Sequence, residues 1–336
     1  MSETAYTSNS AAGVGESADW GYISGRVSVL ETMLLNRTFF ESMLKNRGLS
    51  DARSALAKTP YRVMFTTDDH VRDYYTALES FSDTLLTDIL KSSPAHVLKS
   101  FFESPKRYLA FRNLFLRAAA RGASASDLEN TFDSLAETPF ERTALADHIA
   151  HLRSREAPQF TDSVSRSLFL DSVVCTLRLR LAEAAPEDSV RALLLELAVL
   201  QCWSSVLRSR WNGTSAETVR RWFVVPEAYA GMVSSAAALA ETNPVSALTD
   251  RISDSSLRVL RDIGAEHIRR NVDAAVGEAV RERALEGRMV SYGPERVLSY
   301  LVAYNVEQEN LRLTLASIVN GVEPRIVIER LRREYA

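Results

Sequence analysis

Tyr292-Gly293-Pro294-Glu295 opens the stretch that decides the fold of this chain, and Asn320-Gly321 followed by Pro324 closes it. Pro294 suits the first turn of a helix, because its missing N–H would have no intrahelical partner there. Gly321 suits the end of that helix, because glycine enters the left-handed conformation of a C-cap without a Cβ clash. The sequence therefore predicts a helix of roughly 25 residues, about 40 Å long, with a short second helix starting at Pro324.

The residues between these two signals follow a helical period. Apolar side chains recur at alternating steps of four and three, which places them on one stripe of a helix. Only Gln308 interrupts the series. Its members are Val297, Leu301, Tyr304, Leu311, Leu315 and Ile318.

Polar residues interrupt this predicted helix at its middle. Glu307, Glu309 and Asn310 either include a catalytic base or form a solvated or interhelical polar band, in which Glu309 pairs with Arg312 at i+3. The band is the favoured interpretation, because the sequence offers no other catalytic partner. The charged residues of the second helix and its end form either a solvated face or a docking surface. They are Arg325, Glu329, Arg330 and Arg332.

The rest of the chain has the same character. Only 13 glycines and 10 prolines punctuate 336 residues, which favours long helices. No stretch alternates apolar and polar residues as a strand does, so the predicted fold class is all-α. We expect helices at about Asp68–Lys91, after Ser93-Pro94, and again from Pro105. The Ser, Ala and Gly-rich residues 1–18 are predicted to be a disordered tail without signal-peptide features.

A recurring sequence pattern hints at a repeat. An Arg-Gly or Asn-Gly pair followed by a short predicted helix occurs at Gly48, Gly122, Gly213 and Gly321. The separations are unequal, unlike those of a strict solenoid. The pattern has two alternative explanations, which are a divergent repeated module and the chance recurrence of a common helix end.

Composition narrows the possible functions. Forty basic and 43 acidic residues give a formal net charge of -3. This near balance argues against a nucleic-acid-binding protein, which uses an excess of basic residues to bind phosphates. Cys175 and Cys202 lie in apolar helical patterns, so free thiols in a reducing cytosol are expected rather than a disulfide. No segment approaches the ~20 uncharged apolar residues of a membrane span, so direct membrane insertion is not expected.

Candidate chemical motifs are sparse. Thr67 to Asp73 contains Asp68-Asp69, which is typical of an acidic metal motif or, more simply, of a capped acidic first turn. His148 and His151 stand at i and i+3, but we expect a partly exposed helical pair, since no further ligand lies nearby. Phosphate-loop, dinucleotide-binding and nucleophile-elbow patterns are missing. No catalytic, cofactor-binding or metal-binding residue is therefore predicted.

The terminal stretch resembles the C-terminal signature of the C/d subunit family of V-type and A-type rotary ATPases. The opening residues Tyr22, Arg26 and Leu30 are also similar to the first helix of that family. The matching positions that we single out as a structural signature are Tyr292, Gly293, Pro294, Glu309, Asn310, Arg312, Asn320, Gly321, Pro324, Glu329, Arg330 and Leu331.

This resemblance implies a funnel of three similar helical domains around a pseudo-threefold axis. We accordingly expect helical domains at residues 19–124, 125–214 and 215–336. The last domain includes the C-terminal helix and the short segment after it, residues 324–332, which we call the foot. One departure is Cys202-Trp203-Ser204, which stands where the second domain would carry an equivalent of Asn310-Leu311-Arg312. The wall of the funnel at that domain is expected to be shaped differently.

The implied role is mechanical and non-catalytic. A subunit of this family sits on the cytoplasmic face of the membrane proteolipid (c-type) ring and receives the central shaft (D/F-type subunits). It couples ring rotation to ATP synthesis or hydrolysis, with transport of protons or sodium ions. The resemblance implies no cofactor and no nucleic-acid partner. The alternative function is a general α-helical protein–protein interaction scaffold.

Overall fold

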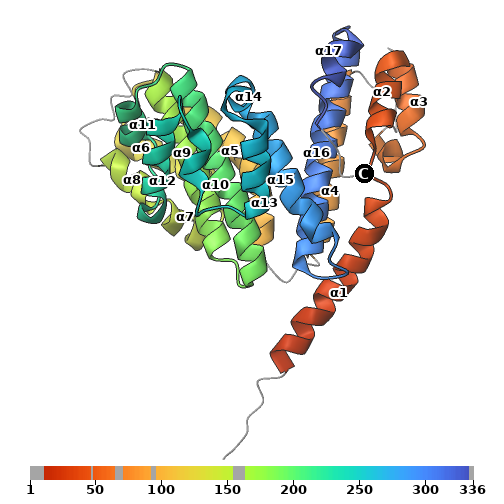
Figure 1. Ribbon diagram of the computed structural model, residues 1–336, viewed down its shortest axis with the longest axis horizontal. Coiled ribbons are helices and arrows are strands. Elements are labelled where there is room, and N and C mark those ends of the chain that lie inside the picture. Colours follow the sequence, from red (N-terminus) through yellow and green to blue (C-terminus); the bar gives the residue numbers. More distant parts are fainter. Residues whose placement is uncertain (1–10, 47, 65–70, 92–95, 154–162, 333–336) are drawn as a thin grey trace, which may run out of the picture. The chain divides into compact units, whose positions relative to one another are not determined.

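A computed structural model describes residues 11–46, 48–64, 71–91, 96–153 and 163–332 (Figure 1). Every regular element within these residues is a helix. The predicted all-α class is therefore confirmed.

The chain divides into two units. Unit 1 contains residues 1–96 and 284–336, and unit 2 contains residues 97–283. These boundaries differ from the predicted ones after residues 124 and 214, because unit 1 joins the two ends of the sequence. The threefold funnel stays a prediction.

Unit 1 has a core built from both ends of the chain. Phe40, Met43 and Leu56 from the first part pack in one cluster with Leu311 and Leu315 from the last part. Figure 1 draws these segments together, with α16 in blue beside α4 in orange. The elements of unit 1 are α1 (Ala11–Glu31), α2 (Arg37–Asn46), α3 (Leu49–Leu56), the 3-10 helix η1 (Pro60–Met64), α4 (Val71–Lys91), α16 (Pro294–Val319) and α17 (Pro324–Ile328).

Unit 2 is organised around α9 and α10, which pack against each other along their length. Trp203 is fully buried on α10, and its indole N–H donates to the carbonyl of Pro244 at 2.9 Å. The elements are α5 (His96–Ala120, with its first residue in unit 1), α6 (Ala125–Asn130), η2 (Thr131–Ser134), α7 (Pro139–Ala144), α8 (Ala146–Arg153), α9 (Ser163–Glu183), α10 (Asp188–Trp211), α11 (Ala216–Trp222), α12 (Glu227–Leu239), η3 (Pro244–Leu248), α13 (Asp254–Ile263), α14 (Ala265–Arg270) and α15 (Val272–Arg288, which ends in unit 1).

Helix α10 is also the one helix of the described part that is long and apolar enough to cross a membrane. Its most apolar window is 78% buried inside the protein. Burial of this kind is what the central helix of a folded unit requires.

Helix α1 starts earlier than predicted. It begins at Ala11, so residues 11–18 are helical, contrary to the predicted disordered tail, while residues 1–10 lie outside the described part. Ala11 and Ala12 are strong helix formers, and their preference outweighs that of the neighbouring glycines and serines.

Helix α5 continues through Pro105, where the sequence predicts the start of a new helix. A proline inside a helix deprives the carbonyl four residues earlier of its donor, and that carbonyl belongs to Phe101. The hydroxyl of Ser104 donates to the Phe101 oxygen at 2.7 Å. Arg107 also donates to the carbonyl of Ser100 at 3.1 Å. These side chains satisfy the interrupted turn, so the helix does not end there.

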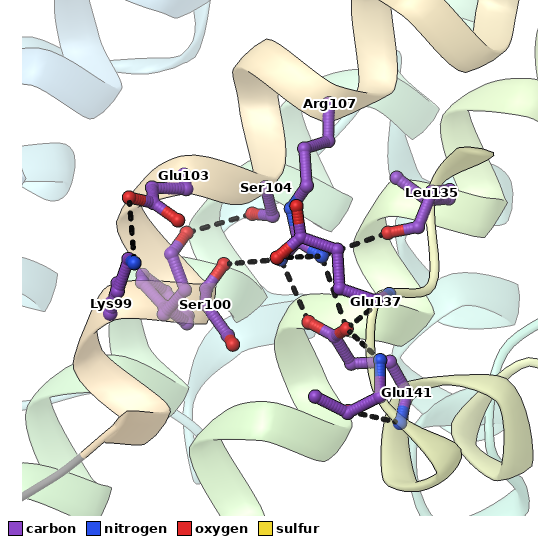
Figure 2. A network of polar contacts seen from close by, with 10 residues as sticks. Lys99, Ser100, Glu103, Ser104, Arg107, Leu135, Glu137 and Glu141 are labelled. Carbon is purple, nitrogen blue, oxygen red and sulfur yellow. Dashed lines mark hydrogen bonds and ion pairs between the residues drawn. The ribbon is translucent and has the colours of Figure 1, made fainter. Parts of the chain in front are cut away.

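The Arg107 guanidinium joins this turn to a second segment of unit 2 (Figure 2). It donates to the two carboxylate oxygens of Glu141 at 2.7 and 3.1 Å and to the carbonyl of Leu135 at 2.9 Å. Glu141 in turn accepts from the backbone N–H groups of Glu137 and Thr138 at 2.8 and 3.1 Å. One buried ion pair therefore holds the start of α7 against the interrupted turn of α5.

Three long helices end in the same way. Gly122, Gly213 and Gly321 have φ angles of 70°, 88° and 64°, and the next residue donates its N–H back to the helix in each case. These bonds are Ala123 to Ala118 (3.2 Å), Thr214 to Ser209 (3.1 Å) and Val322 to Ser317 (2.9 Å). This is the Schellman arrangement.

A short helix follows each of these three ends, namely α6, α11 and α17. Gly48 differs, because its φ is −103° and it acts as the N-cap of α3. Three of the four predicted positions therefore share one local structure.

Candidate functional site

The signature residues all lie in unit 1, along α16, α17 and their flanking loops. The predicted start of both helices and the predicted end of the first are confirmed, since α16 spans Pro294–Val319 and α17 starts at Pro324. We consider this segment the candidate functional site, and its start, middle and end each have distinct contacts. Tyr292, Arg312, Glu329 and Arg330 have exposed side chains.

The start of α16 is bound to α1. Gly293, with a φ of 123°, donates its N–H to the hydroxyl of Ser24 at 2.9 Å. Arg296 donates to the Ser28 hydroxyl at 3.1 Å and to the Glu31 carboxylate at 2.5 Å. Ser24, Ser28 and Glu31 are spaced like one face of a helix, a signal that the sequence analysis did not use. The role of Arg296 was also missed.

The middle of α16 carries a buried carboxylate. Glu307 is only 4% exposed. Its oxygens accept from the backbone N–H of Leu35 and from the hydroxyl of Tyr61. The Tyr61 oxygen accepts in turn from the Gln308 amide at 2.6 Å. Burial, with the nearby charge of Glu307, raises the pKa of Tyr61 well above its ordinary value.

This arrangement tests the two interpretations of the polar residues. Glu307 belongs to an interhelical band, as one of the alternatives predicted, and the prediction of a solvated band is wrong for it. A carboxylate whose oxygens receive donors from the segment before α2 and from η1 holds those segments on α16. Hydrogen bonds buried in this way fix the positions of the segments that they join.

The end of the chain is clamped onto α16. Asn310 donates its amide to the carbonyl of Arg332 at 3.0 Å and accepts the Arg332 N–H at 2.9 Å. Glu309 forms an ion pair with the Arg332 guanidinium at 2.7 Å, whereas the sequence predicted Arg312 as its partner. Leu331 inserts into the core cluster of unit 1. Residues 324–332 are therefore held on α16 by Glu309, Asn310 and the core contact of Leu331.

Three further signature residues form the junction between the end of α16 and the start of α17. Asn320 donates its amide to the carbonyl of Ala316 at 2.7 Å, and Gly321 takes the left-handed conformation. Pro324 occupies the first turn of α17 and is buried. Arg37 of α2 donates to the carbonyl of Ile328 at 3.0 Å, which binds α17 to α2.

The other motifs fall into two groups. Asp68 and Asp69 lie outside the described residues. The predicted partly exposed pair is wrong for His148, which is fully buried with its Nε2 2.9 Å from the Ser172 hydroxyl, whereas His151 is partly exposed. The His151 ring stacks on Phe169. Within the part of the chain that the structure describes, no three His, Cys, Asp or Glu side chains are grouped to hold a metal ion.

The sequence matches no protein-family model, and no curated protein matches it.

Proposed function

We propose that this chain is a non-catalytic rotor subunit of a V/A-type rotary ATPase, joining the central shaft to the proteolipid ring on the cytoplasmic face of the membrane. The observation that carries the proposal is the Schellman helix end that recurs after α5, α10 and α16. A funnel of three similar domains needs three copies of one local unit. The resemblance of residues 292–332 to the C/d subunits points to the same architecture.

The contacts of α16 support a mechanical role. A torque-transmitting part has to resist bending and sliding between its helices. Polar contacts bind α16 to α1 at its start, to Tyr61 and Leu35 at its middle, and to Arg332 at its end. Directional hydrogen bonds of this kind fix the register of neighbouring helices, which apolar packing alone specifies less strictly.

The second candidate is a general α-helical interaction scaffold. The division of the chain into two units rather than three favours it. A scaffold also needs no threefold axis and no ring. The two candidates differ in their partners.

Purification from native membranes in mild detergent tests the proposal. The expected result is co-purification with proteolipid-ring and shaft subunits in a constant ratio. A stable monomer that never associates with either would overturn it and favour the scaffold. A low-resolution map of the isolated protein should show a threefold funnel.

A variant pair tests the mechanical role within the assembled complex. We expect Glu307→Ala to lower the amount of ion transported per ATP hydrolysed, because the Tyr61 and Leu35 contacts are lost. Asn305→Ala is the matched control, since that side chain is exposed on the same helix. Equal transport ratios for both variants and the unmodified complex would contradict the role assigned to the buried contacts.

A further inference from the structure

The two cysteines of the chain lie on the two helices that organise unit 2. Cys175 is on α9 and Cys202 is on α10, and both side chains are fully buried. Their thiols are free and form a hydrogen bond with each other. The proposed function makes no use of this pair.

A second side-chain contact holds the two helices in register at the same level. The Arg178 guanidinium donates to the amide oxygen of Gln201, the residue before Cys202. Arg178 follows Cys175 by three residues, so the two share one face of α9. The thiols therefore face each other at a point where α9 and α10 are already joined.

Arg178 also places a positive charge beside the thiols. Its guanidinium lies 4.0 Å from the centroid of the Phe101 ring, and no carboxylate of the described residues forms an ion pair with it. Burial lowers the pKa of Arg178 to about 10, and the two thiols act against this shift. In return, the charge favours the thiolate of Cys175, although burial keeps the pKa of that thiol well above its ordinary value. A cation beside a cysteine stabilises the thiolate from which disulfide chemistry starts.

We propose that Cys175 and Cys202 are a latent disulfide pair, which hydrogen peroxide converts into a covalent bond between α9 and α10. One sulfur, as its thiolate, attacks a peroxide oxygen, so that an S–O bond forms, the O–O bond breaks, and the displaced hydroxide leaves as water with the proton of that thiol. The second sulfur then attacks the first, so that the S–S bond forms and the S–O bond breaks. The hydroxide released in this step leaves as a second water with the remaining thiol proton. This assignment does not depend on the rotor role.

Burial determines how fast the pair reacts. Both thiols are 0% exposed, so peroxide reaches them only when α9 and α10 open locally. Oxidation of the folded protein should therefore be slow, and it should become faster in urea concentrations below the unfolding transition. The same burial shields the finished disulfide from external thiols. These properties fit a lasting covalent link within unit 2 better than a rapid redox sensor.

Peptide mapping of the full-length protein tests the pair. The protein is incubated with hydrogen peroxide in the folded state, its remaining thiols are blocked with N-ethylmaleimide in urea, and it is digested with trypsin without reductant. Cleavage after arginine releases residues 167–178, which contain Cys175, and residues 192–208, which contain Cys202. The expected product is these two peptides joined, with two hydrogen atoms fewer than their sum and no maleimide label.

Thermal unfolding measures what the bond does to unit 2. Peroxide is expected to raise the Tm of the unmodified protein by about 5 °C, because the disulfide closes a loop in the unfolded chain. Cys175→Ala is the matched control, since its methionines meet the same oxidant but it cannot form the internal bond. Its Tm should not rise. Reduction of the oxidised protein with dithiothreitol in mild urea should reverse the gain, which provides a second control if the variant does not fold.

Four outcomes would overturn the proposal. The first is that both cysteines still carry the maleimide label after prolonged oxidation in mild urea. The second is conversion of the cysteines to sulfinic or sulfonic acid without a joined peptide, which would show that the two sulfurs do not meet. The third is a disulfide between two molecules, seen by electrophoresis without reductant. The fourth is an internal disulfide that lowers the Tm, which would show that the helices are not placed for an unstrained bond.

Discussion

Glu141 in unit 2 and Glu307 in unit 1 are both buried glutamates that accept backbone N–H groups, yet they differ in their side-chain partners. Glu141 binds the cationic guanidinium of Arg107 through two hydrogen bonds. The donors to Glu307 are the neutral hydroxyl of Tyr61 and the N–H of Leu35.

The difference shows in the pKa values. Burial raises the pKa of the Glu141 carboxyl, but the hydrogen bonds and charge of Arg107 outweigh it, so this pKa lies below its ordinary value. At Glu307 it is the pKa of the partner, Tyr61, that is raised, by burial and by the neighbouring negative charge. The Glu141 site therefore relies on an ion pair, whereas the Glu307 site relies on hydrogen bonds from neutral donors.

The largest effect is expected from Arg107→Ala. It leaves the Glu141 carboxylate buried without its cation, which costs about 3–5 kcal/mol of unfolding free energy. Urea unfolding followed by tryptophan fluorescence measures this well, since three of the four tryptophans lie in unit 2. Arg220→Ala, at an exposed position, should change the stability by less than about 0.5 kcal/mol. A loss below about 1 kcal/mol for Arg107→Ala would mean that the ion pair is not the main support of this turn.

A smaller loss is expected at Glu307. Glu307→Ala leaves the donors of Leu35 and Tyr61 unsatisfied and should cost about 2–3 kcal/mol. Glu307→Gln keeps an acceptor oxygen and should cost less than half of that. Equal losses for the two variants would show that the negative charge matters at this site as it does at Glu141. Glu309→Ala, which removes an exposed ion pair, should cost about 0–1 kcal/mol.

The stability of unit 2 should also depend on pH, through His148. Burial, with a contribution from His151, lowers the pKa of His148 to about 3. Between its ordinary value of 6.5 and that value, the unfolded chain binds a proton that the folded chain does not. The contribution of neutral His148 to the free energy of unfolding is therefore fully present above about pH 6.5. Below that pH, the free energy of unfolding falls by up to about 1.4 kcal/mol per pH unit.

Thermal unfolding at several pH values checks this assignment. His148→Gln retains a donor for the Ser172 hydroxyl and should flatten the decline between about pH 6.5 and 5. His267→Gln, at an exposed position, should leave it unchanged. Parallel curves for unmodified protein and His148→Gln would contradict the assignment.

The smallest losses of unfolding free energy are expected at the glycines that end α10 and α16, and they should be equal in the two units. Gly213→Ala and Gly321→Ala each force a Cβ into a left-handed conformation and should cost about 1 kcal/mol. Gly231→Ala inside α12 meets no atom within 4 Å of the new Cβ and should stabilise by about 0.5–1 kcal/mol. Clearly unequal losses at the first two positions, measured by urea unfolding, would argue against a shared module.

The sequence predicted the helix boundaries best where the signals were local. Pro294 and Gly321 act through their own backbone preferences, so the bounds of α16 and α17 follow from a few neighbouring residues. Pro105 misled the prediction for the opposite reason. Its effect depends on Ser104 and on an arginine held by Glu141, and that carboxylate belongs to a segment more than thirty residues further along the chain.

The partners in the candidate site were harder to predict than its residues. Glu307, Glu309 and Asn310 were recognised as a polar interruption of an apolar stripe. Their contacts with Tyr61, Leu35 and Arg332 depend on segments that the sequence analysis could not bring together. A carboxylate at i and an arginine at i+3 are a sound local pair, but the returning chain end offered Glu309 a different arginine.

By itself, the sequence determined the all-α class and the position of the terminal helices, because helix period, proline and glycine act over a few residues. Only the tertiary structure decided which of these helices form a unit, that the foot is clamped by Asn310, and that α5 runs through Pro105. Those outcomes depend on burial and on hydrogen-bond partners that are distant in the chain, and neither is encoded in local periodicity.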